Sequence, residues 1–180
     1  MRKEILQKME IPKNVEVLIE KDYIVIKGSQ GENKRKINLR NIKIYKENKE
    51  LIFECKKATK KEKKAINTFK AHVKNMIDGV SNKFEYQLKI CYSHFPITAE
   101  VKGNELIIKN FIGEKENRKA KIPKGAEVKV DKEIITINSI NREIAGQAAA
   151  NIEQSTKIRK KDRRVFQDGI FIINKAGKEI

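Results

Sequence analysis

Apolar and polar residues alternate over short distances in the first third of the chain. The segments Val15-x-Val17-x-Ile19, Ile24-x-Ile26 and Ile42-x-Ile44 place an apolar side chain at every second position, and polar turns separate them. Period two puts side chains on one face of a β-strand. This part of the chain therefore predicts short, half-buried antiparallel strands.

The apolar spacing changes to three and four residues after position 60. The apolar positions there are Ile66, Phe69, Val73, Met76, Ile77 and Val80. This spacing forms one stripe along a helix. Thr59-Lys60-Lys61-Glu62 matches a capping box, in which the Thr hydroxyl and the Glu carboxylate each accept from an otherwise unpaired backbone N–H. We predict a helix from about residue 60 to 80.

The second half repeats this order of elements. Strand-like alternation returns at Ile97 to Val101, Glu105 to Lys109, Glu127 to Val130 and Ile135 to Ile137, and a second helix is predicted at about residues 142–153, with Ala145, Ala148, Ala149 and Ile152 on one face. The expected fold class is α+β, with two tandem duplicated domains at residues 1–82 and 83–180. Each would be a small, mostly antiparallel sheet packed against one helix.

Two alignments of the halves are available. One pairs Ile11-Pro12-Lys13 with Ile122-Pro123-Lys124, a local match that does not keep the helices in equivalent places. The other pairs the segment from Ile24 to Ile37 with the segment from Leu106 to Ile122 and continues into strands and a helix in both copies. We prefer the second because a duplication preserves element order. Chance similarity between short amphipathic hairpins is the alternative.

Composition narrows the class of protein. Ile, Val, Phe and Leu number 28, 9, 7 and 6, about 28% of the 180 residues, above the roughly 20% below which chains stay disordered. Apolar runs are only a few residues long, which excludes a membrane-spanning helix. The charged N-terminus does not resemble a secretion signal, so we expect a cytoplasmic protein. Cys55 and Cys91 form no CxxC pair, and we expect reduced, buried thiols.

The net charge of +17 predicts a polyanionic partner. Enzymatic signals are weak by comparison: the chain has no phosphate-binding glycine loop and no GxGxxG motif, only two histidines, and five dispersed aspartates. We therefore expect that the protein is not an enzyme and that it has no cofactor, no metal site and no small-molecule substrate.

The strongest candidate site is the run from Lys157 to Arg164, with six basic residues and one acid in eight positions. Lys outnumbers Arg 33 to 8 in the chain, yet three arginines fall at positions 159, 163 and 164. Because the planar Arg fork binds phosphates in a bidentate manner and stacks on nucleobases, we interpret the run as an RNA-binding loop, held by the turn-like stretch Val165–Gly169. A solvated basic face is the alternative.

Three other basic segments give weaker signals. The segment from Gly113 to Lys119 has mixed charges and is nearly as well explained as a plain hairpin turn. The equivalent loop of the first half, around Lys34-Arg35-Lys36, is more basic. The cluster from Lys56 to Lys64 is expected mostly on the solvated outer face of the first helix.

The C-terminal pattern resembles a known family. It reads Gln154-x-x-x-Ile158-x-x-Lys161-x-x-Arg164-x-Phe166-x-Asp168-Gly169-Ile170 and is similar to the signature of large-subunit ribosomal protein L six, in its archaeal and eukaryotic branch. Further matches are Ile11-Pro12, Asn75-Met76-Ile77-x-Gly79-Val80, Tyr92-x-His94-Phe95-Pro96-Ile97, Asn110-Phe111-x-Gly113-Glu114-Lys115 and Gln147-x-Ala149-Ala150-x-Ile152. Phe171 departs from the usual Tyr. The chain stops without the extended tail of eukaryotic members, so it resembles the archaeal type.

The resemblance implies a structural constituent of the large ribosomal subunit. Its implied partners are large-subunit ribosomal RNA near the sarcin–ricin loop and the stalk base, neighbouring ribosomal proteins, and translational GTPases that dock nearby. The RNA-binding residues it implies are Lys157, Arg159, Lys160, Lys161, Arg163, Arg164, Gln167, Asp168 and Gly169, with His94 and Lys115 as additions from matched motifs. The alternative function is a free RNA-binding chaperone or regulator that acts off the ribosome.

Overall fold

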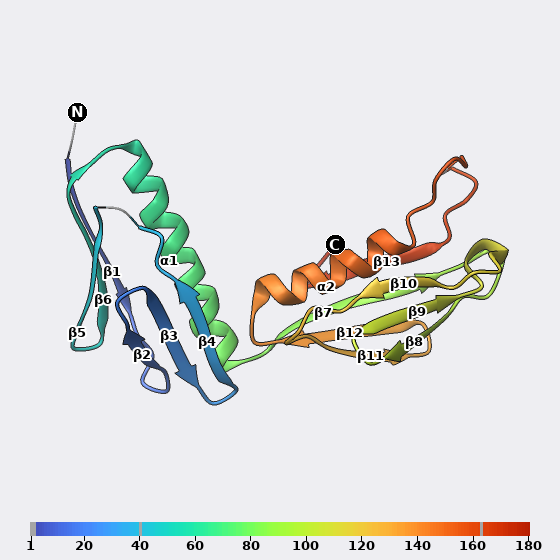
Figure 1. Ribbon diagram of the computed structural model, residues 1–180, viewed down its shortest axis with the longest axis horizontal. Coiled ribbons are helices and arrows are strands. Elements are labelled where there is room, and N and C mark those ends of the chain that lie inside the picture. The colour runs from blue at the N-terminus through green and yellow to red at the C-terminus, as the bar shows by residue number, and fades with distance from the viewer. Residues whose placement is uncertain (1–2, 40, 163) are drawn as a thin grey trace. The chain divides into compact units, whose positions relative to one another are not determined.

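The computed structural model describes residues 3–39, 41–162 and 164–180, and the chain divides into two units between Lys83 and Phe84. The first unit contains seven regular elements among its described residues. They are β1 (Lys3–Glu10), β2 (Glu16–Ile19), β3 (Tyr23–Gly28), β4 (Gly31–Lys36), β5 (Lys43–Glu47), β6 (Glu50–Ala58) and α1 (Lys60–Ser81). The strands form two antiparallel three-stranded sheets, ordered β1-β6-β5 and β2-β3-β4. Helix α1 packs against both of them (Figure 1).

The second unit repeats this order and then extends it. Its elements are β7 (Phe84–Cys91), β8 (Thr98–Lys102), β9 (Glu105–Lys109), the 3-10 turn η1 (Phe111–Gly113), β10 (Arg118–Lys121), β11 (Glu127–Asp131), β12 (Ile134–Ser139), α2 (Arg142–Ser155), β13 (Gly169–Lys175) and β14 (Lys178–Glu179). The sheet β10-β9-β8 corresponds to β4-β3-β2, and the series β7-β12-β11 corresponds to β1-β6-β5. The predicted duplicated α+β fold is confirmed.

The preferred alignment pairs equivalent strands. It matches β3 with β9, whereas the rejected alignment would have matched β2 with β11, which belong to different sheets. Strands β13 and β14 extend the second unit's sheet beyond β7. The described residues of the first unit contain no counterpart, because the chain continues from α1 into β7. The connection from α2 to β13 is therefore an addition specific to the second unit.

The two helices cover their sheets with different side chains. Helix α1 buries a stripe of large residues that includes Ile66, Phe69 and Val73, as its spacing predicts. Helix α2 buries Ala145, Ala148, Ala149 and Ile152, all fully inaccessible. Small side chains allow a helix backbone to lie close to the strands it covers. Helix α2 packs against β7, β10, β12 and β13.

Some expectations differ from the structure. The segment Lys34-Arg35-Lys36 lies in strand β4 and is not a loop. Cys55 is buried as expected, but Cys91 is only partly buried. Neither α1 nor α2 has the length and apolar character needed to cross a membrane, and this holds throughout the described residues.

The N-terminus of α1 offers a test of local stability. The Thr59 hydroxyl accepts from the backbone N–H of Lys61, and the Glu62 carboxylate accepts from the backbone N–H of Thr59. Thr59→Ala removes the first bond, so we expect it to lower the unfolding free energy of the first unit by about 0.5–2 kcal/mol. Chemical denaturation measures this loss. Thr59→Ser keeps the hydroxyl and is the control; equal stability of the two variants would show that the cap contributes nothing.

Candidate nucleic-acid interface

The cationic residues of the C-terminal motif lie on the connection between α2 and β13, residues 156–168, which we call the basic loop. Figure 1 shows it leaving the end of α2 and returning into β13. Its cationic side chains at Lys157, Arg159, Lys160, Lys161 and Arg164 are all exposed. Arg163, also predicted from the sequence, lies outside the described residues. The described part of the loop therefore carries five cations and one exposed acid, Asp162.

A tight turn gives the loop its own internal structure. The backbone carbonyl of Asp162 accepts from the N–H groups of Val165 (3.2 Å) and Phe166 (2.9 Å). Its side chain accepts from the N–H of Arg164 at 2.9 Å, a local bond typical of Asp in turns. The Gln167 amide donates to the Arg164 carbonyl at 3.2 Å. These bonds order the part of the loop that follows Asp162 and carries Arg164.

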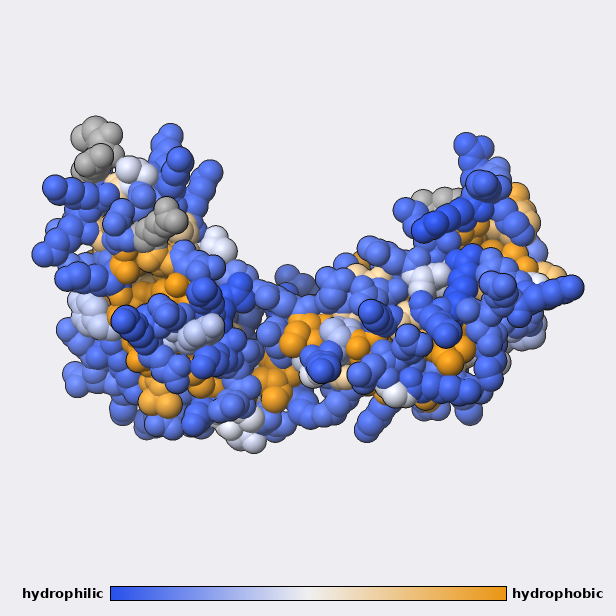
Figure 2. Space-filling model, viewed as in Figure 1, coloured by the Kyte–Doolittle hydropathy of each residue, from blue (hydrophilic) through white to orange (hydrophobic). Residues whose placement is uncertain are grey.

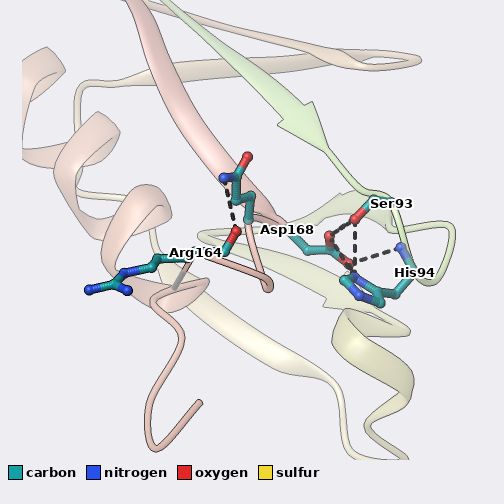
Figure 3. A network of polar contacts seen from close by, with 5 residues as sticks. Ser93, His94, Arg164 and Asp168 are labelled. Atoms are coloured by element: carbon teal, nitrogen blue, oxygen red, sulfur yellow. Dashed lines mark hydrogen bonds and ion pairs between the residues drawn. The ribbon is translucent and has the colours of Figure 1, made fainter. Parts of the chain in front are cut away.

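Asp168 anchors the C-terminal end of the loop. Its side chain is 1% exposed and accepts hydrogen bonds from Ser93 and His94, which follow β7 (Figure 3). The donors are the Ser93 N–H (3.0 Å), the Ser93 hydroxyl (2.8 Å), the His94 N–H (3.3 Å) and the His94 Nδ1–H (3.1 Å). A buried carboxylate is costly unless donors satisfy its oxygens, so the hydrogen bonds of Asp168 favour this one position of its side chain. The loop end is therefore pinned to the segment after β7.

The same contacts shift the ionisation of Asp168. Burial raises the pKa of its carboxyl, but the hydrogen bonds from Ser93 and His94 outweigh burial and bring the pKa below its usual value. Hydrogen bonds to the charged form favour that form. The anchor is thus a carboxylate at neutral pH.

Phe166 ties the loop to the same histidine. Its ring stacks on the His94 ring, with centroids 4.8 Å apart and planes 19° apart. The Lys161 ammonium lies 4.5 Å from the centroid of the Phe166 ring, within cation–π range. His94 therefore supports the loop through Asp168 and through Phe166.

Arg118 holds the other end of the loop. Its guanidinium donates to the carbonyls of Ser155 (2.9 Å) and Lys157 (3.3 Å). It also forms a bidentate pair with Glu114, at 2.7 and 2.6 Å, which holds the pKa of the Glu114 carboxyl below its usual range. Exposed Lys115 follows Glu114 directly. The fold thus ties the second basic segment of the sequence to the first.

The guanidinium of Arg164 extends away from the Asp168 network (Figure 3), so it is available to a partner. Among the other predicted site residues, Gln167 and Lys115 are exposed, His94 keeps 33% of its side chain exposed, and Asp168 and Gly169 are buried.

Figure 2 shows hydrophilic residues over most of the visible surface, interrupted by small hydrophobic areas.

Sequence reasoning missed three residues that organise the site. Nothing in the local sequence marks Ser93 or Thr156 as important. In the structure Thr156 is 3% exposed, and its hydroxyl accepts a hydrogen bond from the N–H of Ile170 at 3.0 Å. Arg118 could have been noticed, because the argument that Arg stands out in a Lys-rich chain applies to it as well. All three form hydrogen bonds to Asp168 or to backbone groups at the ends of the loop, and so they hold the loop in place.

Comparison with known proteins shows the family to which the chain belongs. The family model of ribosomal protein L6 matches residues 11–83 and 95–169. The chain is 44% identical over 174 residues to large ribosomal subunit protein uL6 of Methanococcus vannielii, covering 97% of this chain and 96% of that protein. It is also 44% identical over 171 residues to the protein of the same name from Methanobrevibacter smithii, covering 95% and 96%. The chain therefore belongs to the ribosomal protein L6 family, in its archaeal type.

Proposed function

We propose that this protein is a structural constituent of the large ribosomal subunit and binds large-subunit ribosomal RNA through the basic loop. The observation that carries the proposal is five exposed cations on a loop fixed at both ends, by Asp168 and by Arg118. Family membership and the net charge of +17 support it. RNA binding here is charge neutralisation and fit of shape, without catalysis.

The fixed loop has an energetic advantage for binding. A flexible segment loses backbone conformational entropy when it binds, at about 1–2 kcal/mol for each residue that becomes fixed. In this protein Thr156 and Arg118 hold one end of the loop, Asp168 holds the other, and hydrogen bonds to Asp162 and Arg164 order the part before Asp168. We assign phosphate binding to Lys157, Arg159, Lys160, Lys161 and Arg164, and also to Arg163, for which the sequence is the only argument. Asp168 and Gly169 hold the loop in place.

The finer position in the subunit is also part of the proposal. The resemblance of the C-terminal motif to its family supports a position of the loop near the sarcin–ricin loop and the stalk base, where it would support the region in which translational GTPases dock. Neighbouring ribosomal proteins complete the site. Lys115 lies on the segment that Arg118 ties to the basic loop, so we assign it a supporting phosphate contact. His94 contributes through Phe166 and Asp168.

Binding should depend steeply on salt. Each neutralised phosphate releases condensed counterions, so log K falls with log salt by about 0.7–0.9 per phosphate contact. The five described cations of the loop alone should give a fall of roughly 100- to 500-fold between 50 and 200 mM salt, and contacts from Arg163 and Lys115 would add to it. The measurement is the affinity for a ribosomal RNA fragment that carries the sarcin–ricin region. Equal affinity at both salt concentrations would rule out the electrostatic account.

Co-sedimentation separates this proposal from an RNA chaperone or regulator that acts off the ribosome. A structural constituent should stay with large subunits through a moderate salt wash. A protein that leaves the subunits under those conditions and associates with free RNA would support the alternative.

A further inference from the structure

A pocket of about 890 Å³ lies beside the basic loop, within the second unit. It is formed by Cys91 at the end of β7 and the two residues that follow it, by the last turn of α2, by the basic loop and by Phe171 of β13. Pockets for small ligands span about 300–1,000 Å³. The pocket is therefore large enough for a single nucleotide, and the network around Asp168 forms part of its wall.

The walls present aromatic faces that the protein leaves open. Tyr92 is 44% exposed and Phe171 is 41% exposed, and both line the pocket. The position of the Phe171 ring depends on Gly169, because a Cβ there would lie 3.0 Å from the ring. Gly169 thus leaves the space in which this ring lies. Large exposed rings of this kind are the surfaces on which RNA-binding proteins stack unpaired nucleobases.

Polar and cationic groups surround these rings. Lys157 lines the pocket, and Lys161 approaches Phe166, another lining residue. Gln154 also lines it, and no hydrogen bond of its amide is found within the described residues. An amide both donates and accepts, so it can pair with the edge of a nucleobase, while ammonium groups at the rim match the flanking phosphates.

We propose that this pocket receives one unpaired nucleobase of ribosomal RNA, stacked against Tyr92 and Phe171, with its neighbouring phosphates on Lys157 and Lys161. This inference rests on the proposed function, since the nucleobase belongs to the RNA that the basic loop binds. It adds a contact of different physical character. Stacking does not release counterions, so its contribution does not follow the salt dependence of the phosphate contacts.

The test uses the full chain and the RNA fragment that carries the sarcin–ricin region. Tyr92→Leu and Phe171→Leu, singly and together, remove the rings and keep an apolar side chain. We expect the double variant to bind about 5- to 150-fold more weakly, with the slope of log K against log salt unchanged. Phe171→Tyr keeps the ring and should bind like the unmodified protein. Tyr23→Leu in the first unit, where the tyrosine is 36% exposed, is the matched control and should also leave affinity unchanged.

Chemical probing gives a second readout that does not depend on affinity. Under saturating conditions, dimethyl sulfate should modify one unpaired A or C of the fragment more strongly with the double variant than with the unmodified protein. Hydroxyl-radical protection of the backbone should be the same for both. If Phe171→Leu fails to fold, as circular dichroism would show, the comparison of Tyr92→Leu with Tyr23→Leu carries the test.

The outcomes distinguish the inference from the function on which it rests. If the variants bind within twofold of the unmodified protein and the slope is steep, the pocket holds no nucleobase and the proposed function stands. If the unmodified protein does not bind the fragment, or binds it equally at both salt concentrations, the proposed function fails and the pocket inference fails with it.

Discussion

Asp168→Asn is expected to destabilise the second unit by about 1–3 kcal/mol and to weaken RNA binding about 10-fold or more. With the amide oxygen at the Oδ1 position it still accepts from Ser93, but the amide nitrogen at the Oδ2 position is a donor that faces the backbone N–H of His94. A buried donor left without an acceptor costs about 1–3 kcal/mol. Binding weakens because the backbone of the released loop must be ordered again on the RNA, at about 1–2 kcal/mol for each residue. Urea unfolding and RNA titration measure the two effects.

The stability difference should depend on pH in one direction. The folded-state pKa of Asp168 lies below its usual value, so the carboxylate stabilises the fold at pH values above its unfolded-state pKa, near 3.9. That contribution is lost as the pH falls from there through the folded-state pKa. The unfolding free energy of the unmodified protein should therefore exceed that of Asp168→Asn by a constant amount above about pH 5. Below about pH 4 this difference should shrink as the pH falls.

Asp131→Asn is the control for this variant. Asp131 is an exposed carboxylate at the end of β11 in the same unit, so its loss should change stability by no more than about 0.5 kcal/mol. An Asp168→Asn variant as stable as this control at pH 7, with unchanged RNA affinity, would mean that the Ser93–His94–Asp168 network does not hold the loop.

Removal of the loop cations should have the largest effect on binding. The variant replaces five cations by Gln, at Lys157, Arg159, Lys160, Lys161 and Arg164. We expect its slope of log K against log salt to be shallower by up to about 4.5, at 0.9 per phosphate contact. Its affinity at 50 mM salt should fall by about 100-fold or more, and the deficit should narrow as salt rises. Because these side chains are exposed, the fold should tolerate the change. Fluorescence anisotropy over a salt series measures both quantities.

The first helix supplies a control with the same change in charge. Gln at Lys60, Lys61, Lys63, Lys64 and Lys74 removes five exposed cations from α1. If the basic loop is the specific contact, this variant should keep most of the slope and the affinity. Equal losses from the two variants would show that net charge, and not the placement of the loop, determines binding.

The regular elements were predictable where local pattern determines them. The apolar stripe of α1, its capping box and the alanine face of α2 are all read from spacing, and the structure has them. Strand β4 was missed because Gly31–Lys36 is polar at nearly every position, and its identity as a strand comes from pairing with β3. Pairing with a neighbouring strand leaves no trace in the apolar periodicity of the polar strand itself.

In the candidate site, too, local features were predictable from the sequence and long-range contacts were not. The arginines of the loop were visible as a composition anomaly. The sequence predicted a turn-like stretch at Val165–Gly169, whereas the hydrogen-bonded turn begins earlier, at Asp162. The anchor was not visible, because Ser93 and Asp168 are 75 positions apart and meet only when β13 pairs with β7. Burial reverses the apparent role of Asp168: a charged residue beside a cationic run suggests a surface contact, but at 1% exposure its partners are inside the protein.

A density map of the large ribosomal subunit that contains this protein tests the central claim most directly. We predict that the loop between α2 and β13 lies against ribosomal RNA, with Lys157, Arg159, Lys160, Lys161 and Arg164 within hydrogen-bonding distance of phosphate oxygens. A map in which these side chains face solvent or another protein, while RNA contacts a different surface of the chain, would contradict the account.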